Sequence, residues 1–129
     1  LESLLPDDDS ILTKAMRYSV LNGGKRLRPL LVYLSSELGN STSEAQDLVS
    51  SAVELIHCYS LIHDDLPSMD DDSLRRGLPT CHKKFGEAIA ILAGDALQPM
   101  AYSLLTQSNE IEDKLKVKLV ALLSKACGQ

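Results

Sequence analysis

Apolar residues recur every three or four positions over most of the chain, which is the spacing of amphipathic helices. The longest such run, SEAQDLVSSAVELIHCYSLIHDDL, covers residues 43–66, and its apolar residues at helical spacing are Leu48, Ala52, Leu55, Tyr59 and Ile62. Ser41 and Glu44 have the spacing of a capping box before this run, and Pro67 stops it. The pattern predicts a helix of about 24 residues and roughly 35 Å.

Two shorter helices are predicted before this one. The first has Asp9 or Ser10 as its N-cap, runs through ILTKAMRYSVL and ends at Gly23-Gly24. The second takes Pro29 into its first turn and continues through LLVYLSSEL until Gly39.

Two helices are predicted after it, over about Gly86 to Leu105, with Gly94 and Pro99 as weak points, and from Glu110 to about Cys127. The stretch between Pro67 and about Cys81 is a polar, turn-rich loop, long enough inside a compact domain to suggest function. Because no segment alternates as a strand does, the predicted fold class is all-α.

Composition narrows the possible functions. A chain of 129 residues with 44% apolar content can form one globular domain with its own core. The net charge of −5 argues against a nucleic-acid binder. We see no run of about 18 apolar residues and no signal peptide, so no membrane span is expected. The three cysteines (Cys58, Cys81 and Cys127) form neither a zinc pattern nor an obvious disulfide framework, which favours a reducing cytoplasm.

The segment HDDLPSMDDDSLRR, residues 63–76, carries five aspartates within nine positions and then two arginines. Asp64 and Asp70 are six residues apart, which on a regular helix would place them about 120° from each other. Pro67 breaks the helix, so two extra residues can loop out and return Asp70 beside Asp64. Carboxylates fixed at a helix end suit magnesium. The alternative is a solvated acidic helix end, which the helix dipole disfavours.

Two basic clusters complement these carboxylates. GGKRLRP, residues 23–29, places Lys25, Arg26 and Arg28 between a glycine pair and a helix N-terminus, where anions are favoured. Arg75 and Arg76 follow the aspartates and can bind phosphate bidentately. Either cluster alone could be a solvated basic turn, but together with a metal site they suggest two phosphate-bearing groups.

The histidines are less informative. His57 lies seven residues before Asp64 and so shares its helix face, which makes a ligand-facing role plausible. A structural role is the simpler interpretation of His63 and His82.

GGKRLRP, IHCYSLIHDDLPSMDDDSLRRG and FGEAIAILAGDAL together resemble the trans-polyprenyl diphosphate synthases, and their spacing is most similar to that of the bacterial farnesyl-forming members. The resemblance implies an all-helical bundle around a central cavity, in which magnesium holds an allylic diphosphate beside isopentenyl diphosphate. It also implies a cytoplasmic homodimer. Family members are more than twice as long and carry a second aspartate-rich motif, so residues 1–129 are expected to be the N-terminal part of one synthase domain.

The resemblance also assigns roles by motif position. Asp64 and Asp70 match the magnesium ligands, with Asp65 and Asp71 as nearby support, and Arg75 matches a contact to the allylic diphosphate. The match to the isopentenyl diphosphate site consists of Lys25, Arg28, His57 and Arg76. Tyr59 matches a bulky residue that stops the growing chain at fifteen carbons, although it could instead be a core tyrosine.

Four alternatives remain at this point. A geranylgeranyl-forming synthase differs only in product length. A noncatalytic synthase subunit is disfavoured because both metal aspartates and both cation clusters are intact. An HD-type phosphohydrolase could use His57, His63 and Asp64, but it leaves the Asp70–Arg76 run unexplained. A class I terpene cyclase would not need GGKRLRP for a second diphosphate.

Overall fold

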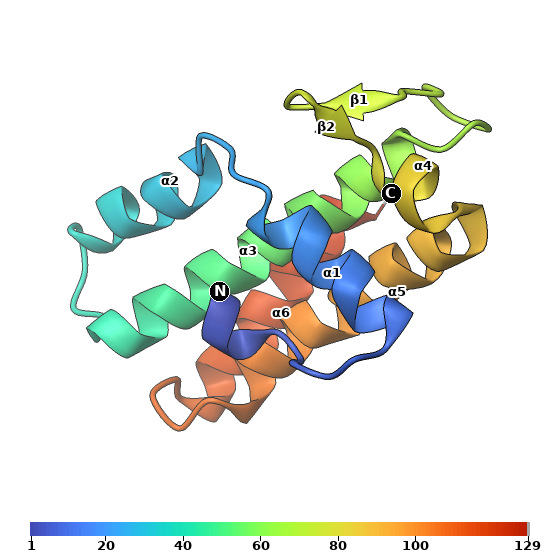
Figure 1. Ribbon diagram of the computed structural model, residues 1–129. Coiled ribbons are helices and arrows are strands. Elements are labelled where there is room, and N and C mark those ends of the chain that lie inside the picture. The colour runs from blue at the N-terminus through green and yellow to red at the C-terminus, as the bar shows by residue number, and fades with distance from the viewer. Residues whose placement is uncertain (129) are drawn as a thin grey trace. The chain divides into compact units, whose positions relative to one another are not determined.

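Helices make up most of the protein, which confirms the predicted all-α fold class. The computed structural model describes residues 1–128. Its elements are η1 (Glu2–Leu4), α1 (Ile11–Leu21), α2 (Leu27–Ser36), α3 (Ser43–Asp64), β1 (Leu74–Arg75), β2 (Leu78–Pro79), α4 (Cys81–Phe85), α5 (Glu87–Gln107) and α6 (Asp113–Cys127) (Figure 1).

The chain forms two compact units, and both long helices contribute to each of them. The first unit comprises Leu1–Lys25 and His57–Gln98, and the second comprises Arg26–Ile56 and Pro99–Gln129. The first unit therefore contains the end of α3, both strands and residues 64–72, which carry the five aspartates and which we call the acidic segment.

In the first unit, α1 packs against α4, and the strands connect to both. The Ser10 hydroxyl caps α1 by accepting from the Thr13 amide at 3.1 Å, as the sequence predicted. The rings of Tyr18 and Phe85 meet edge to face at 5.4 Å. The Tyr18 hydroxyl donates to the Pro79 carbonyl at 2.8 Å. These contacts hold the two strands against α1, and they thereby position Arg75 in β1 and Arg76 in the following turn.

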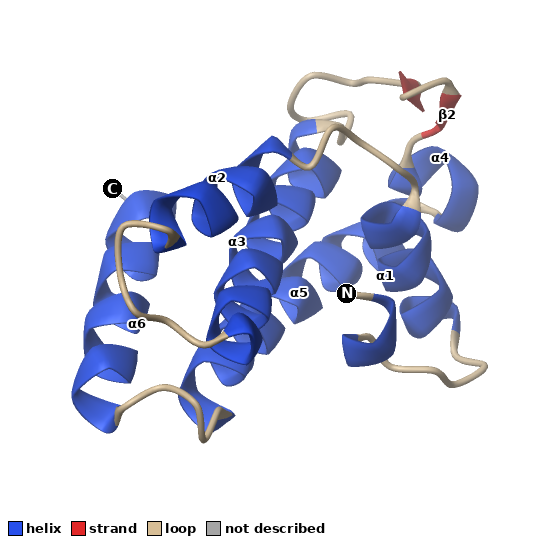
Figure 2. Ribbon diagram, turned by 90° about the vertical axis from the view of Figure 1, so that its left-hand side faces the viewer, coloured by secondary structure: helices blue, strands red, loops and turns tan. Residues whose placement is uncertain are grey.

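In the second unit, α2 and α6 lie beside the N-terminal half of α3 (Figure 2). The Tyr33 hydroxyl donates to the Asp47 carboxylate and joins α2 to α3. A groove of about 210 Å³ opens between these helices. Large apolar side chains stay exposed on α2, namely Leu27, Leu30, Leu31 and Leu34.

The core of α3 follows its helical spacing. Ala52 and Leu55 are fully buried and Ile62 is nearly so, as predicted. Leu48 and Tyr59, which share the same spacing, are only partly buried.

Several element boundaries differ from the sequence prediction. Thr42, not Ser41, caps α3, because its hydroxyl accepts from the Ala45 amide at 3.2 Å. The helix α3 ends at Asp64 and α2 at Ser36, both earlier than predicted. The predicted fourth helix corresponds to α5, which begins at Glu87 as expected and ends at Gln107, slightly later than predicted. The separate five-residue helix α4 precedes it, and α6 begins at Asp113, later than the predicted Glu110.

The predicted loop between Pro67 and Cys81 contains a small antiparallel hairpin, which the sequence did not predict. Leu74 pairs with Pro79 and Arg75 with Leu78, so Arg76 and Gly77 form a two-residue turn. Both turn residues have positive φ, 55° and 81°, as a type I′ turn requires. We call residues 74–79 the arginine hairpin.

The helix α5 is long and apolar enough to cross a membrane by length and composition, at a mean hydropathy of 1.3 over its best window. The sequence pattern did not predict this. A core helix passes the same test, and Ala90, Ala93, Leu97 and Ala101 of α5 are fully buried within the protein.

Candidate functional site

The end of α3 brings Asp64 and Asp70 together. The backbone amide of Asp70 donates to the carbonyl of Asp64 at 2.8 Å, and that of Asp71 donates to Leu66 at 3.1 Å. The loop after Pro67 therefore returns to the helix end, as the spacing argument predicted. Asp64 is half-buried and Asp70 exposed, and neither carboxylate has a hydrogen-bond or ion-pair partner among the described residues.

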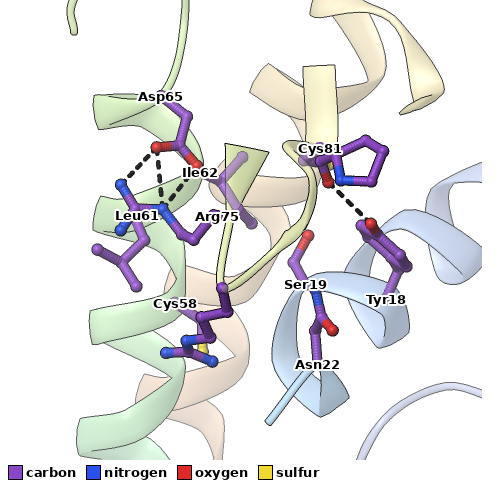
Figure 3. A pocket seen from close by; sticks show the side chains of 11 residues that line it. Tyr18, Ser19, Asn22, Cys58, Leu61, Ile62, Asp65, Arg75 and Cys81 are labelled. Carbon is purple, nitrogen blue, oxygen red and sulfur yellow. Dashed lines mark hydrogen bonds and ion pairs between the residues drawn. The ribbon is translucent and has the colours of Figure 1, made fainter. Parts of the chain in front are cut away.

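Asp65 has a different environment from its neighbours. Its side chain is 3% exposed and is bound by the Arg75 guanidinium. The Nε of Arg75 donates to both carboxylate oxygens, at 2.9 and 2.8 Å, and Nη2 donates to Oδ1 at 2.5 Å (Figure 3). These hydrogen bonds raise the pKa of Arg75 above its ordinary value. Arg75 was predicted to contact a diphosphate; its Nε and Nη2 bind Asp65, whereas its Nη1 has no partner among the described residues.

Arg76 reaches back to the glycine pair at the end of α1. Its Nη1 donates to the carbonyl of Gly23. A Cβ on Gly24 would lie 2.6 Å from the guanidinium carbon, and Gly24 has a φ of 115°. Because Gly24 has no side chain, the Arg76 guanidinium can occupy the space beside it. The contact joins two motifs 53 residues apart in the sequence.

In the GGKRLRP turn, Arg26 points inward and the other two cations are exposed. Arg26 has a positive φ of 48°, and its Nη1 donates at 2.6 Å to Glu54, whose side chain is 2% exposed. Lys25 and Arg28 are exposed, with no partner among residues 1–128. The turn thus has one structural arginine and two cations available to a ligand.

A cavity of about 30 Å³ lies beneath the arginine hairpin. It is lined from α1, α3 and the hairpin, for example by Ser19, Cys58 and Arg75 (Figure 3). A cavity of this size holds a water molecule but not a substrate. Cys81 also lines it, and burial raises the pKa of this thiol. No disulfide joins the three cysteines, all of which the structure describes.

The side chains of His57, Tyr59 and His63 on α3 are partly buried, whereas His82 of α4 is buried. His57 is half-buried on α3, two turns before Asp64. The His63 Nε2 contacts the carbonyl of Ile91 at 3.2 Å, and the His63 ring meets Tyr59 edge to face at 5.3 Å. The structural interpretation of His63 is therefore confirmed. His82 is buried with Nδ1 3.2 Å from the Thr80 hydroxyl, while its Nε2 has no hydrogen-bond partner among the described residues.

Comparison with known proteins identifies the family. The model of a family described as polyprenyl synthetase matches residues 9–129. The chain belongs to the polyprenyl synthetase family. This membership confirms the resemblance drawn from the motifs and decides against an HD-type phosphohydrolase.

Individual relatives agree with the family match. Farnesyl diphosphate synthase of Escherichia coli (strain K12) is 52% identical over 126 residues, covering 96% of this chain and 42% of the relative. Geranylgeranyl pyrophosphate synthase 12 of Arabidopsis thaliana is 47% identical over 128 residues, covering 98% of this chain and 36% of that protein. The chain thus spans less than half the length of these curated relatives.

Similar solved structures show the same helical arrangement. A structure of an FPP/GFPP synthase from Zymomonas mobilis matches with a TM-score of 0.93 at 46% identity, covering 98% of this chain and 47% of the other. A geranyltransferase from Legionella pneumophila also gives 0.93, at 44% identity and 98% and 46% coverage. The fold of this polyprenyl synthetase chain is therefore that of isoprenoid synthases.

Sequence reasoning missed three features of this polyprenyl synthetase site. It gave Asp65 only a supporting role beside the metal ligands and did not predict that this carboxylate is buried and binds Arg75. It gave Arg26 no role of its own within the basic turn, although Arg26 binds the buried Glu54. It took Gly24 only as a helix end, although Arg76 lies against it. No helical spacing marks these pairings, because the partners lie at least ten residues apart in the sequence and outside one helix.

Proposed function

We propose that this chain is the N-terminal part of a magnesium-dependent prenyltransferase that condenses isopentenyl diphosphate with dimethylallyl or geranyl diphosphate to give farnesyl diphosphate. The observation that supports this most is the contact of Arg76 with the Gly23-Gly24 turn. This contact lies within the first compact unit, which contains the acidic segment, the arginine hairpin and Lys25.

Magnesium fits the donors that the acidic segment offers. Magnesium prefers oxygen ligands, needs only one or two protein carboxylates and completes its shell with water and phosphate. Asp64 and Asp70 meet this description, since both side chains are at least partly exposed and lack hydrogen-bond and ion-pair partners among residues 1–128. Within those residues no group of three side chains suited to a metal converges, so a ligand set of two carboxylates plus substrate oxygens is the one we propose.

The proposed reaction needs stabilisation of the departing group more than a nucleophilic side chain. The bond between C1 and the oxygen of the allylic diphosphate breaks, and the diphosphate leaves with the electron pair. Asp64 and Asp70 would hold the magnesium, which would supply positive charge to offset the charge that develops on this leaving group. The Nη1 of Arg75, which does not bind Asp65, would add to that stabilisation. The double bond of isopentenyl diphosphate then attacks the allylic cation, and loss of a proton restores a double bond.

Lys25, Arg28, His57 and Arg76 are proposed to hold the isopentenyl diphosphate, which does not ionise. Lys25 and Arg28 are exposed cations without protein partners in the described chain. The cytoplasm and a homodimeric state belong to the same proposal. The alternative product is geranylgeranyl diphosphate, which the similarity to the Arabidopsis thaliana protein supports.

The test is turnover by the full-length protein with either metal aspartate replaced. Asp64→Ala and Asp70→Ala should each lower prenyl transfer by about a hundredfold or more at saturating magnesium, with the circular dichroism spectrum unchanged. Asp7→Ala, which removes an exposed carboxylate elsewhere, is the matched control. Near-normal turnover by either variant would contradict the proposed coordination.

A further inference from the structure

The five aspartates of the acidic segment fall into two environments. Asp65 is 2% exposed, whereas Asp64 is half-buried and Asp70, Asp71 and Asp72 are exposed. The backbone amide of Asp65 donates to the Leu61 carbonyl at 3.2 Å. This hydrogen bond continues the last turn of α3 and directs the Asp65 side chain inward. A buried carboxylate of this kind must have a permanent counter-charge.

Arg75 supplies that counter-charge. Three contacts of 2.5 to 2.9 Å bind its Nε and Nη2 to the Asp65 carboxylate, and Asp72 lies 3.6 Å from Nη2. If Arg75 swung away to a ligand, Asp65 would remain as an uncompensated buried charge, which is strongly unfavourable. Arg75 therefore keeps this orientation when a ligand binds.

One edge of the guanidinium stays available. The Nη1 of Arg75 has no partner among the described residues, and the side chain is 31% exposed. A guanidinium has five donors in a rigid plane, so fixing Nε and Nη2 also fixes the direction of Nη1. The hairpin that carries Arg75 is held a second time by Arg76 on Gly23.

We propose that Asp65 is a positioning residue that fixes the Arg75 guanidinium and leaves its Nη1 for the allylic diphosphate, and that Asp65 is not a magnesium ligand. This inference rests on the proposed function. The two adjacent aspartates then have separate roles, since Asp64 binds the metal and Asp65 orients an arginine.

The deciding experiment compares Asp65→Asn, Arg75→Ala and the double variant in the full-length protein. Each single variant should lower kcat/KM for the allylic diphosphate by about ten- to a hundredfold, because a misplaced contact loses that much rate. The double variant should be no worse than Arg75→Ala, since Asp65 acts through Arg75. The magnesium concentration for half-maximal activity should not change in Asp65→Asn but should rise in Asp64→Asn.

Two results would overturn the inference. One is a double variant whose loss equals the product of the single losses. The other is a magnesium requirement that rises in Asp65→Asn as much as in Asp64→Asn.

If Asp65→Asn does not fold, Arg75→Lys tests the same proposal. Lysine keeps a positive charge beside Asp65 but replaces the rigid fork by a single point donor. We expect a raised KM for the allylic diphosphate and an unchanged KM for isopentenyl diphosphate. An unchanged allylic KM in a folded Arg75→Lys protein would overturn the proposal.

Calorimetry separates this inference from the proposed function. Absence of prenyl transfer by the unaltered full-length protein would refute the function alone. Binding of inorganic pyrophosphate in the presence of magnesium needs no turnover, and it should weaken about tenfold in Arg75→Lys and in Asp65→Asn, as expected for loss of one charge-assisted contact. Unchanged pyrophosphate binding in both variants would refute the role of Asp65.

Discussion

Replacing Gly94 by alanine should destabilise the protein by about 2 kcal/mol, although alanine is the better helix former. Gly94 lies within α5 and is buried. A Cβ there would overlap Nε2 of His63 and lie 2.6 Å from its Cδ2. Because carbon atoms pack best at about 3.5 to 4 Å, the His63 ring would have to move by about 1 Å.

The magnitude follows from opposing contributions. Overpacking of this kind costs about 1 to 3 kcal/mol, and losing the His63 contact with the Ile91 carbonyl adds about 1 kcal/mol. Replacing a helical glycine by alanine stabilises the folded state by about 1 kcal/mol and so offsets part of this loss. The net effect is a destabilisation of about 2 kcal/mol, with the steric overlap deciding its sign.

Urea unfolding followed by far-ultraviolet circular dichroism measures this difference. The matched control is Gly94→Ala in a His63→Ala background. There the ring is absent, so the same substitution should stabilise by about 0.5 to 1 kcal/mol. A stabilising effect of Gly94→Ala in the presence of His63 would show that the ring does not occupy this space, and would refute the reasoning.

Three further predictions concern the proposed active site. Lys25→Ala and Arg28→Ala should each raise the KM for isopentenyl diphosphate more than that for the allylic substrate, because the interactions of these two cations contribute largely to ground-state binding. A larger rise in the KM for the allylic substrate would mean that the assignment of the two diphosphate sites is reversed. Tyr59→Ala in the full-length protein should shift products to about twenty carbons or more by removing a side chain roughly 7 Å along α3 from Asp64; an unaltered farnesyl peak on chromatography would leave Tyr59 as packing. The 129-residue chain alone should not turn over, and steady turnover by mass-verified material would contradict this.

Gly24 offers a test of how the two basic clusters are joined. Gly24→Ala places a Cβ against the Arg76 guanidinium and forces a φ that alanine rarely adopts. We expect a raised KM for isopentenyl diphosphate, measured by steady-state kinetics. Gly77→Ala, which also has positive φ but open space around its Cβ position, is the matched control. Equal effects of both substitutions would mean that backbone strain and not Arg76 is responsible.

The long helices could be predicted from sequence because their signals are local. The Ser10 cap and the buried Ala52 and Leu55 of α3 follow from spacing alone. The return of Asp70 to Asp64 was also predictable, since a proline within a short polar segment breaks the helix there. Each of these features depends on residues within about two helical turns.

The arginine hairpin and the partners of the charges could not be predicted in this way. Strands of two residues are too short to show alternation, and Arg76-Gly77 is a weaker turn signal than Asn-Gly. Asp64 and Asp65 are adjacent and chemically identical, so only the hairpin decides which of them Arg75 binds. Helical spacing carries no information about that pairing, because the hairpin that carries Arg75 lies beyond the end of α3.

Burial of the acidic partner explains how the cations of this chain divide between stability and binding. Arg26 and Arg75 each bind a carboxylate that is 2 to 3% exposed, and a buried acid cannot lose its counter-charge without a large penalty. Lys25 and Arg28 have no such partner among residues 1–128 and remain exposed. An anionic ligand can therefore bind Lys25 and Arg28 at little cost to the fold. The orientations of Arg26 and Arg75 are instead fixed before any ligand binds, and only the Nη1 of Arg75 is left for the proposed contact to a diphosphate.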